Sequence, residues 1–451
     1  MGLTSSRTEL PDNIELEEAR PMISILSAMF AAVFDRGELL AKARELGVLQ
    51  RLREIHPADV ARALVECALG DEKRSIATAR RHYGRISGFV PEESAFYGRF
   101  NAGLAALMKH LFSRALESCT KVQRECLARV LGGAGLTDLL AVDASQCALP
   151  KSAAANFPST DRTRGGLKLT ALLSVLHQTL RKVVVTDARM HDRRALQLPA
   201  QIEGSLILMD RGYCDRKLFA TIEQGGGFFL TRLKTSHRPT ITHIRAGLGQ
   251  QYLGQPVTPH LPYGDEADLD AEFVMPGGER RTYRVVRLVI APSGRKGSSE
   301  APVELLFVTN LTVDQFSPDQ LATLYRLRWE VERLFLVLKT VGRMDQLRSA
   351  NPHVIEAFLY ATLLGLVLAT QVCAAMRQLR PTLEPSLQRV TVLLLGYLPR
   401  IIEAIGSRAH HRALREFERA LWREGVNPNP GRPYTASTYG TELAWLAGLS
   451  T

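Results

Sequence analysis

The chain has 451 residues, enough for about two to four domains, and a formal net charge of +11, which indicates a polyanionic partner, nucleic acid before membrane. The cysteines are widely separated and form no Cys-x-x-Cys pair, which excludes a disulfide framework or a zinc site and indicates a reduced, cytoplasmic protein: Cys67, Cys119, Cys126, Cys147, Cys214 and Cys373. No secretory signal is expected, because the apolar run from Met22 to Phe34 follows an acidic segment.

The first part of the chain is expected to be helical, since apolar residues recur with a helical period over residues 20 to about 130. Residues 75–112 predict a helix, a turn around Gly88 and a second helix entered at Glu92, a spacing typical of a helix-turn-helix. The candidates for DNA contact are basic residues of the first helix and three residues at the start of the second: Arg74, Arg80, Arg81 and Arg85, and Phe96, Tyr97 and Arg99. The alternative is a helical packing domain with a solvated basic face.

From Leu139 the pattern changes to short apolar and β-branched runs, which predict strands. LLAVDAS (139–145) and SLILMDRGYCD (205–215) each look like a buried strand that ends in an acid. The runs 167–178 and 182–189 are expected to form a hairpin. After them we expect a helix at 193–202, a helix at 216–224 and a strand at 228–234.

The segment from about Ser236 to Ser299 is rich in Gly, Pro and charge and carries hairpin signals, so we expect a strand-rich insertion. PVELLFVTNL (302–311) then restores a core strand, and the last hundred or so residues are expected to be helical. The uncharged segment from Ala357 to Met376 has the length of a membrane span, but its polar residues and the lack of a second span favour a buried helix.

The helix after the insertion has a clear start. Ser317 is suited to the N-cap and Gln320 to the third helical position of a capping box, with Pro318 in the first turn between them. Gly342 is a plausible stop. The pattern therefore predicts one helix from residue 318 to about 341.

This helix contains the stretch YRLRWEVERLFLVLK, in which polar side chains stand among large apolar ones. At about 100° per residue, four of them fall within an arc of roughly 60° along the edge of the buried face: Tyr325, Arg328, Glu332 and Lys339. Arg326, Glu330 and Arg333 are expected on the opposite, solvated side. The alternative is an ordinary surface helix with i,i+4 ion pairs such as Arg328 with Glu332.

Three carboxylates form the candidate metal site. A carboxylate at the rim of a buried strand is costly unless it is paired or metal-bound, which singles out Asp143 and Asp210. Glu332 is the natural third acid, because its helix borders the same core. Three oxygen ligands without His or Cys suit Mg²⁺ or Mn²⁺, and two such ions promote phosphodiester displacement. Taken singly, either Asp is equally well explained as a turn or cap residue.

These residues resemble those of bacterial DDE transposases of the insertion-sequence-four family. The family signature Tyr-x2-Arg-x3-Glu-x6-Lys is matched by Tyr325, Arg328, Glu332 and Lys339, and LLAVDAS and LILMDRGYCD resemble the strands that carry its two Asp residues. FFLTRLK and LFVTNL resemble strands on either side of the insertion, so the likeness covers residues 70 to 375.

The resemblance implies an α/β fold with an RNase H-like core, a mixed five-stranded sheet interrupted by a β-rich insertion. It implies cleavage at transposon ends and strand transfer into target DNA, with two Mg²⁺ or Mn²⁺ ions on Asp143, Asp210 and Glu332. Tyr325, Arg328 and Lys339 would contact the end DNA, and Arg232 and Lys168 are weaker DNA-contact candidates. The implied partners are double-stranded DNA, as terminal inverted repeats and target, and a second copy of the chain in a synaptic homodimer; no membrane is implied.

The expected organisation follows from these assignments. Residues 1–135 form a helical DNA-binding region, with its helix-turn-helix-like part at about 73–110, and residues 136–235 and 301–376 form the two parts of the catalytic core. Residues 236–300 form the β-rich insertion, and residues 377–451 a helical C-terminal region. The protein is expected in the bacterial cytoplasm, associated with the nucleoid when bound to DNA.

Some alternatives stay open from the sequence. Glu330 competes with Glu332 as the third acid, and His191 and Asp192 lie near the site at most as supporting residues. Tyr325 as a recombinase nucleophile would need an Arg/His/Arg cluster and would make both Asp residues dispensable. A DNA-binding repressor derived from a transposase, or a nuclease of the same fold without strand transfer, are the remaining alternatives.

Overall fold

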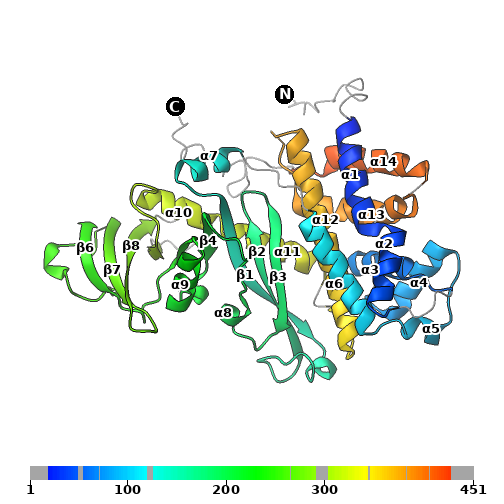
Figure 1. Ribbon diagram of the computed structural model, residues 1–451, viewed down its shortest axis with the longest axis horizontal. Helices are drawn as coiled ribbons and strands as arrows, with labels where there is room; N and C mark the ends of the chain where they lie inside the picture. The colour runs from blue at the N-terminus through cyan, green and yellow to red at the C-terminus, as the bar shows by residue number, and fades with distance from the viewer. Residues whose placement is uncertain are drawn as a thin grey trace, which may run out of the picture. The chain divides into compact units, whose positions relative to one another are not determined.

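The computed structural model of the protein describes residues 19–48, 54–70, 72–118, 125–264, 266–290, 303–343, 346–381, 383–405 and 407–427. Contacts divide the chain into two compact units, shown in Figure 1 and described separately. The helical unit comprises Met1–Val122, Val341–Arg343 and His353–Pro428, and the sheet unit Gln123–Thr340, Met344–Pro352 and Asn429–Thr451. The acidic N-terminal segment, the end of the expected insertion at 291–300 and the C-terminal tail from residue 428 lie outside the described residues.

The described part of the helical unit contains these helices: α1 (Ala19–Phe34), α2 (Arg36–Glu45), α3 (Pro57–Leu69), α4 (Ile76–Ser87), α5 (Glu93–Tyr97), α6 (Ala102–Glu117), α12 (Pro352–Leu379), α13 (Leu387–Glu403) and α14 (Ala409–Glu424). The amphipathic helix α14 packs its apolar face on α1 and α13. The helical character expected for both ends of the chain is therefore confirmed in the described residues.

The helix-turn-helix prediction does not hold in detail. Helix α4 is capped by Ser75 and ends at Gly88, which adopts a left-handed φ of 70°. The predicted second helix is broken, because Asn101 accepts a hydrogen bond from the backbone of Leu104 and starts a new helix, leaving α5 with 5 residues. Phe96 is fully buried and its ring centroid lies 5.5 Å from that of Tyr83, so Phe96 does not reach DNA.

Helix α12 holds the helical unit together. It is long and apolar enough to cross a membrane, but 94% of its most apolar stretch is buried inside the protein, as expected for a core helix. Its Gly365 lies so close to Leu69 of α3 that an added Cβ would overlap the leucine side chain. We therefore read α12 as the core of this unit.

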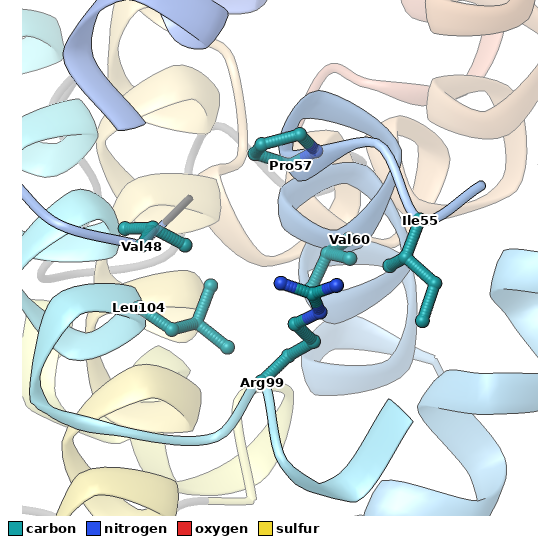
Figure 2. Close-up of a pocket in the computed structure, with 6 residues that line it drawn as sticks. All are labelled: Val48, Ile55, Pro57, Val60, Arg99 and Leu104. Carbon is teal, nitrogen blue, oxygen red and sulfur yellow. The ribbon is translucent and has the colours of Figure 1, made fainter. Parts of the chain in front are cut away.

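A small cavity also lies in the helical unit, and Figure 2 shows the guanidinium of Arg99 directed into it between Leu104 and Val60. Its volume is about 10 Å³, enough for about one water molecule. The lining is apolar apart from the arginine: Val48, Ile55, Pro57, Val60, Arg99 and Leu104. The cavity is too small for a substrate and belongs to the packing of α3 and α6.

The sheet unit is built on one nine-stranded mixed sheet within the described residues, with strand order β3-β2-β1-β4-β5-β9-β8-β7-β6. The strands are β1 (Asp138–Leu149), β2 (Gly165–Ser174), β3 (Thr179–Asp187), β4 (Ser205–Met209), β5 (Phe228–Arg232), β6 (Thr240–Ala246), β7 (Glu266–Val274), β8 (Arg280–Ile290) and β9 (Val303–Thr309). The helices are α7 (Glu125–Gly133), α8 (Asp192–Ala195), α9 (Arg216–Gln224), α10 (Pro318–Arg326) and α11 (Trp329–Thr340), with short 3₁₀ turns η1 (Lys151–Ala153), η2 (Arg211–Tyr213) and η3 (Gln250–Tyr252). The α/β class is confirmed.

Strand pairing follows the sequence pattern closely. The predicted hairpin is present as β2 antiparallel to β3, and β1, β4 and β5 form a parallel set in the middle of the sheet. The helix expected at 193–202 is wrong in length, since α8 ends at Ala195 and Leu196 is extended. Pro199 lacks an N–H and disfavours helical geometry at the residue before it, which limits the helix.

The insertion does not form a separate sheet. Its strands β6, β7 and β8 pair with one another, and β8 pairs with β9, which in turn pairs antiparallel with β5. Phe219 of α9 stacks on Phe229 of β5 at 4.2 Å, and Tyr283 of β8 meets both rings edge-on. The insertion and the strands that carry the two acids therefore share one sheet and one core.

Candidate active site

The parallel pairing of β1 with β4 brings two carboxylates side by side. The register runs from Asp138 opposite Ser205 to Val142 opposite Met209, so Asp143 and Asp210 are the next residues on adjacent strands. Adjacent strands lie about 4.8 Å apart. Asp210 directly follows β4, but β1 continues to Leu149 along β2, so the expectation that Asp143 ends its strand is wrong: only the parallel pairing ends there.

The side chain of each Asp is oriented by a backbone N–H one or two residues later in the chain. The N–H of Ala144 donates to Asp143 Oδ1 at 2.8 Å, and the N–H of Gly212 donates to Asp210 Oδ2 at 3.5 Å, with Asp210 capping η2. The carbonyl of Asp210 accepts from Thr231 Oγ1 on β5 at 3.1 Å. These contacts use few of the carboxylate lone pairs, which leaves the remaining ones for a ligand.

The polar stretch at 325–339 does not lie on one helix. Helix α10 starts at the predicted capping box of Ser317 and Gln320, but it ends at Arg326, and α11 begins at Trp329. The N–H groups of Leu327 and Arg328 bond to carbonyls three residues earlier, which tightens the chain at the junction. The predicted continuous helix is therefore wrong at this point.

The break changes which side chains are buried. Tyr325, Arg328 and Glu330 are buried, Glu332 is partly exposed and Lys339 is exposed. Glu330 was expected on the solvated side and is only 8% exposed. An angle computed along one straight helix does not carry across the tightened junction, and for this reason the expected position of Glu330 is wrong.

Helix α11 contacts β1 and β2 and carries Glu332 on its first turn. Arg328 Nη2 lies 2.6 Å from Glu332 Oε1, so the i,i+4 ion pair considered from the sequence is present. It is not an ordinary surface pair, because the arginine side chain is only 10% exposed and the glutamate 29%. Arg328 Nε is also buried without a hydrogen-bond acceptor among the described residues.

The three acids act on one another electrostatically. The pKa of Asp143 is raised to about 6, chiefly by burial; the Ala144 N–H and Arg328 oppose the rise, and the charges of Glu332 and Asp210 contribute to it. The carboxylate of Asp143 is therefore ionised at a cost near neutral pH. This is the environment in which a bound cation is stabilising.

The donor set fits a divalent metal in chemistry and in charge. Asp143, Asp210 and Glu332 supply only oxygen ligands, as Mg²⁺ and Mn²⁺ prefer. Among the described residues no three such groups converge closely enough to hold an ion as they stand. Glu332 Oε1 contacts Arg328 instead, so a metal on all three acids requires the Glu332 carboxylate to move toward the two aspartates.

Residues 134–368, just over half of the 451-residue chain, match the family model described as Transposase DDE domain. The chain belongs to this family. The matched part of this DDE domain begins just before β1 and includes Asp143, Asp210 and Glu332.

Individual transposases resemble the chain over very different lengths. The putative transposase InsL for insertion sequence element IS186A of Escherichia coli (strain K12) is 39% identical over 66 residues, which cover 15% of this chain and 18% of that protein. The transposase for insertion sequence element IS231F of Bacillus thuringiensis subsp. israelensis is 21% identical over 403 residues, covering 80% of this chain and 82% of that protein. The transposase for insertion sequence element IS231E of Bacillus thuringiensis subsp. finitimus is 22% identical over 379 residues, covering 75% of this chain and 77% of that protein. The match thus spans less than a fifth of the IS186A relative but most of the IS231 relatives.

The expected DNA contacts of the DDE domain differ in their surroundings. The ring of Tyr325 packs against that of Phe307 at 4.9 Å, and the Arg328 guanidinium lies 5.7 Å from the Tyr325 ring centroid. Burial raises the pKa of Tyr325 to about 12, which makes its hydroxyl a poor recombinase nucleophile. Arg232 is half-buried at the end of β5 with its charge acting on Tyr325, and Lys339 is exposed on the last turn of α11.

Lys168, the other weaker DNA-contact candidate, lies on β2. It is buried, and its ammonium donates to the carbonyl of Met190 and lies 2.6 Å from Asp192 Oδ1. His191 caps the one-turn helix α8 that begins with Asp192. This geometry favours a structural tie between β2 and α8 and gives no support to a DNA contact for Lys168.

Two further residues, Tyr213 and Lys234, lie near the acids and were not predicted as site residues. Burial raises the pKa of Tyr213, and the charges of Asp192, Asp143 and Asp210 add to the shift, so the phenol lies among the acids of the site. Lys234 donates to the carbonyl of Gly212 at 3.0 Å and braces the turn after Asp210. The DRGYCD motif was the available signal for Tyr213, whereas the bond from Lys234 depends on tertiary contacts.

Proposed function

We propose that the protein is a bacterial DNA transposase of the insertion-sequence-four type, in which Asp143, Asp210 and Glu332 hold two Mg²⁺ or Mn²⁺ ions. The observation that carries the proposal is the register of β1 and β4, which makes the two aspartates neighbours beside the helix that bears Glu332. When bound, the ions would supply Lewis acid chemistry for cleavage at element ends and for strand transfer.

Tyr325 on α10, Arg328 at the junction and Lys339 on α11 are proposed to position the DNA. Arg328 has a buried Nε without an acceptor, and a planar guanidinium binds phosphate in a bidentate manner. A phosphate that takes this arginine would release Glu332 toward the two aspartates. Lys339 supplies a point charge about two turns beyond Glu332 on α11, and Tyr325 supplies an aromatic surface beside the site.

The finer structural assignment follows the same reasoning. We propose that β1 to β5, with the order β3-β2-β1-β4-β5 and a parallel middle, are an RNase H-like core that β9 extends toward the insertion. One proposed partner is duplex DNA, both as the terminal inverted repeats and as the target. The other is a second copy of the chain, because two element ends must be brought together. The proposed location is the cytoplasm, at the nucleoid when DNA is bound.

The test uses a plasmid that carries the element's terminal inverted repeats, incubated in Mg²⁺ with the purified protein and a target plasmid. We expect cleavage at the ends and joined products, both absent in EDTA and in Asp143→Ala, Asp210→Ala and Glu332→Ala. Glu330→Gln is the matched control, since Glu330 is the neighbouring acid on the same helix, and it should cut like the wild type.

Each outcome bears on a specific part of the proposal. Cleavage that survives in one of the three variants removes that residue from the metal site, and survival in all three overturns the mechanism. Loss in Glu330→Gln with survival in Glu332→Ala moves the third acid to Glu330. Cleavage without joined products makes the protein a nuclease.

A further inference from the structure

The solvent-exposed face of α14, far along the chain from the acids, carries a row of arginines. Arg408, at the N-cap, and four arginines inside the helix recur every three or four residues: Arg408, Arg412, Arg415, Arg419 and Arg423. At about 100° per residue they fall within an arc of roughly 80°, and at about 1.5 Å per residue the row is roughly 22 Å long. All five side chains are exposed. We call these five residues the arginine row.

Little acid offsets this charge. Glu416 lies at the edge of the row, 3.4 Å from Arg412 and 3.9 Å from Arg400 of α13, and Glu424 pairs with Arg423. Arg408, Arg415 and Arg419 have no carboxylate at ion-pair distance among the described residues. Glu418 is buried and accepts from Trp422 Nε1 at 3.3 Å; its charge acts on Arg419, but the two form no ion pair. The row therefore presents a net positive surface.

The arrangement works against the stability of α14 itself. Like charges four residues apart, such as Arg415 with Arg419, repel each other on a helix. The positive end of the helix dipole favours an acidic residue in the first turn, but the first turn of α14 has none. This turn instead follows Arg408 and contains Arg412. A sequence that needed only a soluble helix face would mix the two signs of charge, so the row points to a ligand.

The surroundings of the row select the class of ligand. A protein interface needs apolar anchors at its centre, and none of the exposed large hydrophobic side chains of the described residues lies on α14. A membrane surface needs a free apolar helix face, and that of α14 is packed on α1 and α13. A straight row of guanidiniums without lysine matches a linear series of phosphates, and about 22 Å corresponds to roughly six base pairs.

We propose that the arginine row binds the phosphate backbone of duplex DNA, independently of sequence, as a DNA-contact surface separate from the site around Asp143. The inference rests on the proposed DNA partner and adds the residues that hold the duplex outside the catalytic centre. Binding by such a surface is dominated by counterion release and depends steeply on salt.

The experiment measures fluorescence anisotropy of a labelled random-sequence duplex of about 30 base pairs with the full chain in EDTA, over a range of KCl concentrations. In Arg415→Gln/Arg419→Gln we expect the slope of log affinity against log salt to fall by about 2, and affinity near 0.1 M salt to fall roughly 10- to 60-fold. Arg415→Lys/Arg419→Lys keeps the charge and should retain most of the slope. Gln is a good helix former, so the helix is preserved.

A second pair controls for net charge. Arg44→Gln/Lys109→Gln removes two exposed positive charges from α2 and α6 of the same unit and should leave the slope within experimental error. An unchanged slope in Arg415→Gln/Arg419→Gln, or an equal fall in the control pair, overturns the proposal. A changed molecular mass in solution with an unchanged slope would make the row a protein interface instead. Because EDTA prevents cleavage, either result is independent of whether the acids are catalytic.

Discussion

Two of the arginine–carboxylate pairs in the sheet unit, one in the insertion and one at the candidate active site, differ in how fully the arginine is hydrogen-bonded. Arg284 of β8 contacts both oxygens of Asp268, with Nη2 at 2.6 Å and Nε at 3.0 Å and 3.2 Å, and its Nη1 donates to the carbonyls of Thr312 and Phe316. These two side chains are only 3% and 6% exposed. Arg328 meets Glu332 through one contact of 2.6 Å and has a buried Nε without an acceptor.

The difference separates a structural ion pair from a functional one. Every guanidinium nitrogen of Arg284 has an acceptor, and its bonds to Thr312 and Phe316 fix the segment that leads into α10. At the candidate active site, the Nε of Arg328 lacks a hydrogen-bond acceptor among the described residues, and its partner Glu332 is partly exposed. A saturated buried pair holds the fold, whereas an unsaturated one is ready to exchange its partner for a phosphate or a metal.

The largest expected effect is on the saturated pair. Asp268→Ala should lower the free energy of unfolding of the sheet unit by about 3–5 kcal/mol, because it leaves the buried Arg284 without its counter-ion. The measurement is urea unfolding of the full chain. Asp270→Ala is the matched control: it sits two residues away on β7, is 23% exposed and pairs with Arg245, so it should cost less than about 1 kcal/mol. Equal losses in both variants would contradict the distinction.

The next largest effect is expected on the pH dependence of stability, at Asp143. Burial raises the pKa of folded Asp143 to about 6 from an ordinary value of 3.8, so the folded state binds this proton more tightly than the unfolded state. Stability contributed by this group is therefore lost as pH rises from about 4 to about 6. Asp143→Asn should stabilise the metal-free protein by about 2 kcal/mol at pH 7.5 and by little at pH 4. Thermal unfolding in EDTA at both pH values tests this, and a destabilised variant at pH 7.5 would refute it.

A smaller effect is expected from the unsaturated pair. Arg328→Gln frees Glu332 and removes a positive charge near Asp143, so the affinity of the DNA-free protein for Mn²⁺ should rise about 10-fold, or about 1.4 kcal/mol. Calorimetric titration with Mn²⁺ measures it. Arg328→Lys keeps the charge and should change the affinity less than the Gln variant does. A weaker or unchanged affinity in Arg328→Gln would show that the arginine does not compete with the metal.

The smallest effect is expected at Tyr325. Its hydroxyl is buried and makes no hydrogen bond of ordinary geometry within the described residues, so Tyr325→Phe should change stability by less than about 1 kcal/mol, with a gain favoured. Tyr283→Phe is the control, since the Tyr283 hydroxyl donates to Glu223 at 2.8 Å and its loss should cost about 1 kcal/mol. Urea unfolding of the two variants compares them directly, and a larger loss at Tyr325 would indicate a partner for its hydroxyl.

Much of the sheet could be predicted because its signals are local. The apolar run of β4, the hairpin of β2 and β3 and the capping box at Ser317 depend on residues close in sequence. The break at Leu327 could not be predicted, because neither proline nor glycine marks it. It depends on tertiary packing: α10 packs on β5 and β8, whereas α11 packs on β1 and β2. The same limit hid the burial of Glu330 and Lys168.

By itself, the sequence determined the helix or strand character of most elements and the acids that follow the parallel pairing, because hydrophobic period and turn chemistry act over a few residues. Only the tertiary structure decided that the insertion extends the same sheet, that Glu332 contacts Arg328, and that α14 turns its arginines to solvent. These features depend on which surfaces remain after distant elements have packed, and no local pattern encodes that.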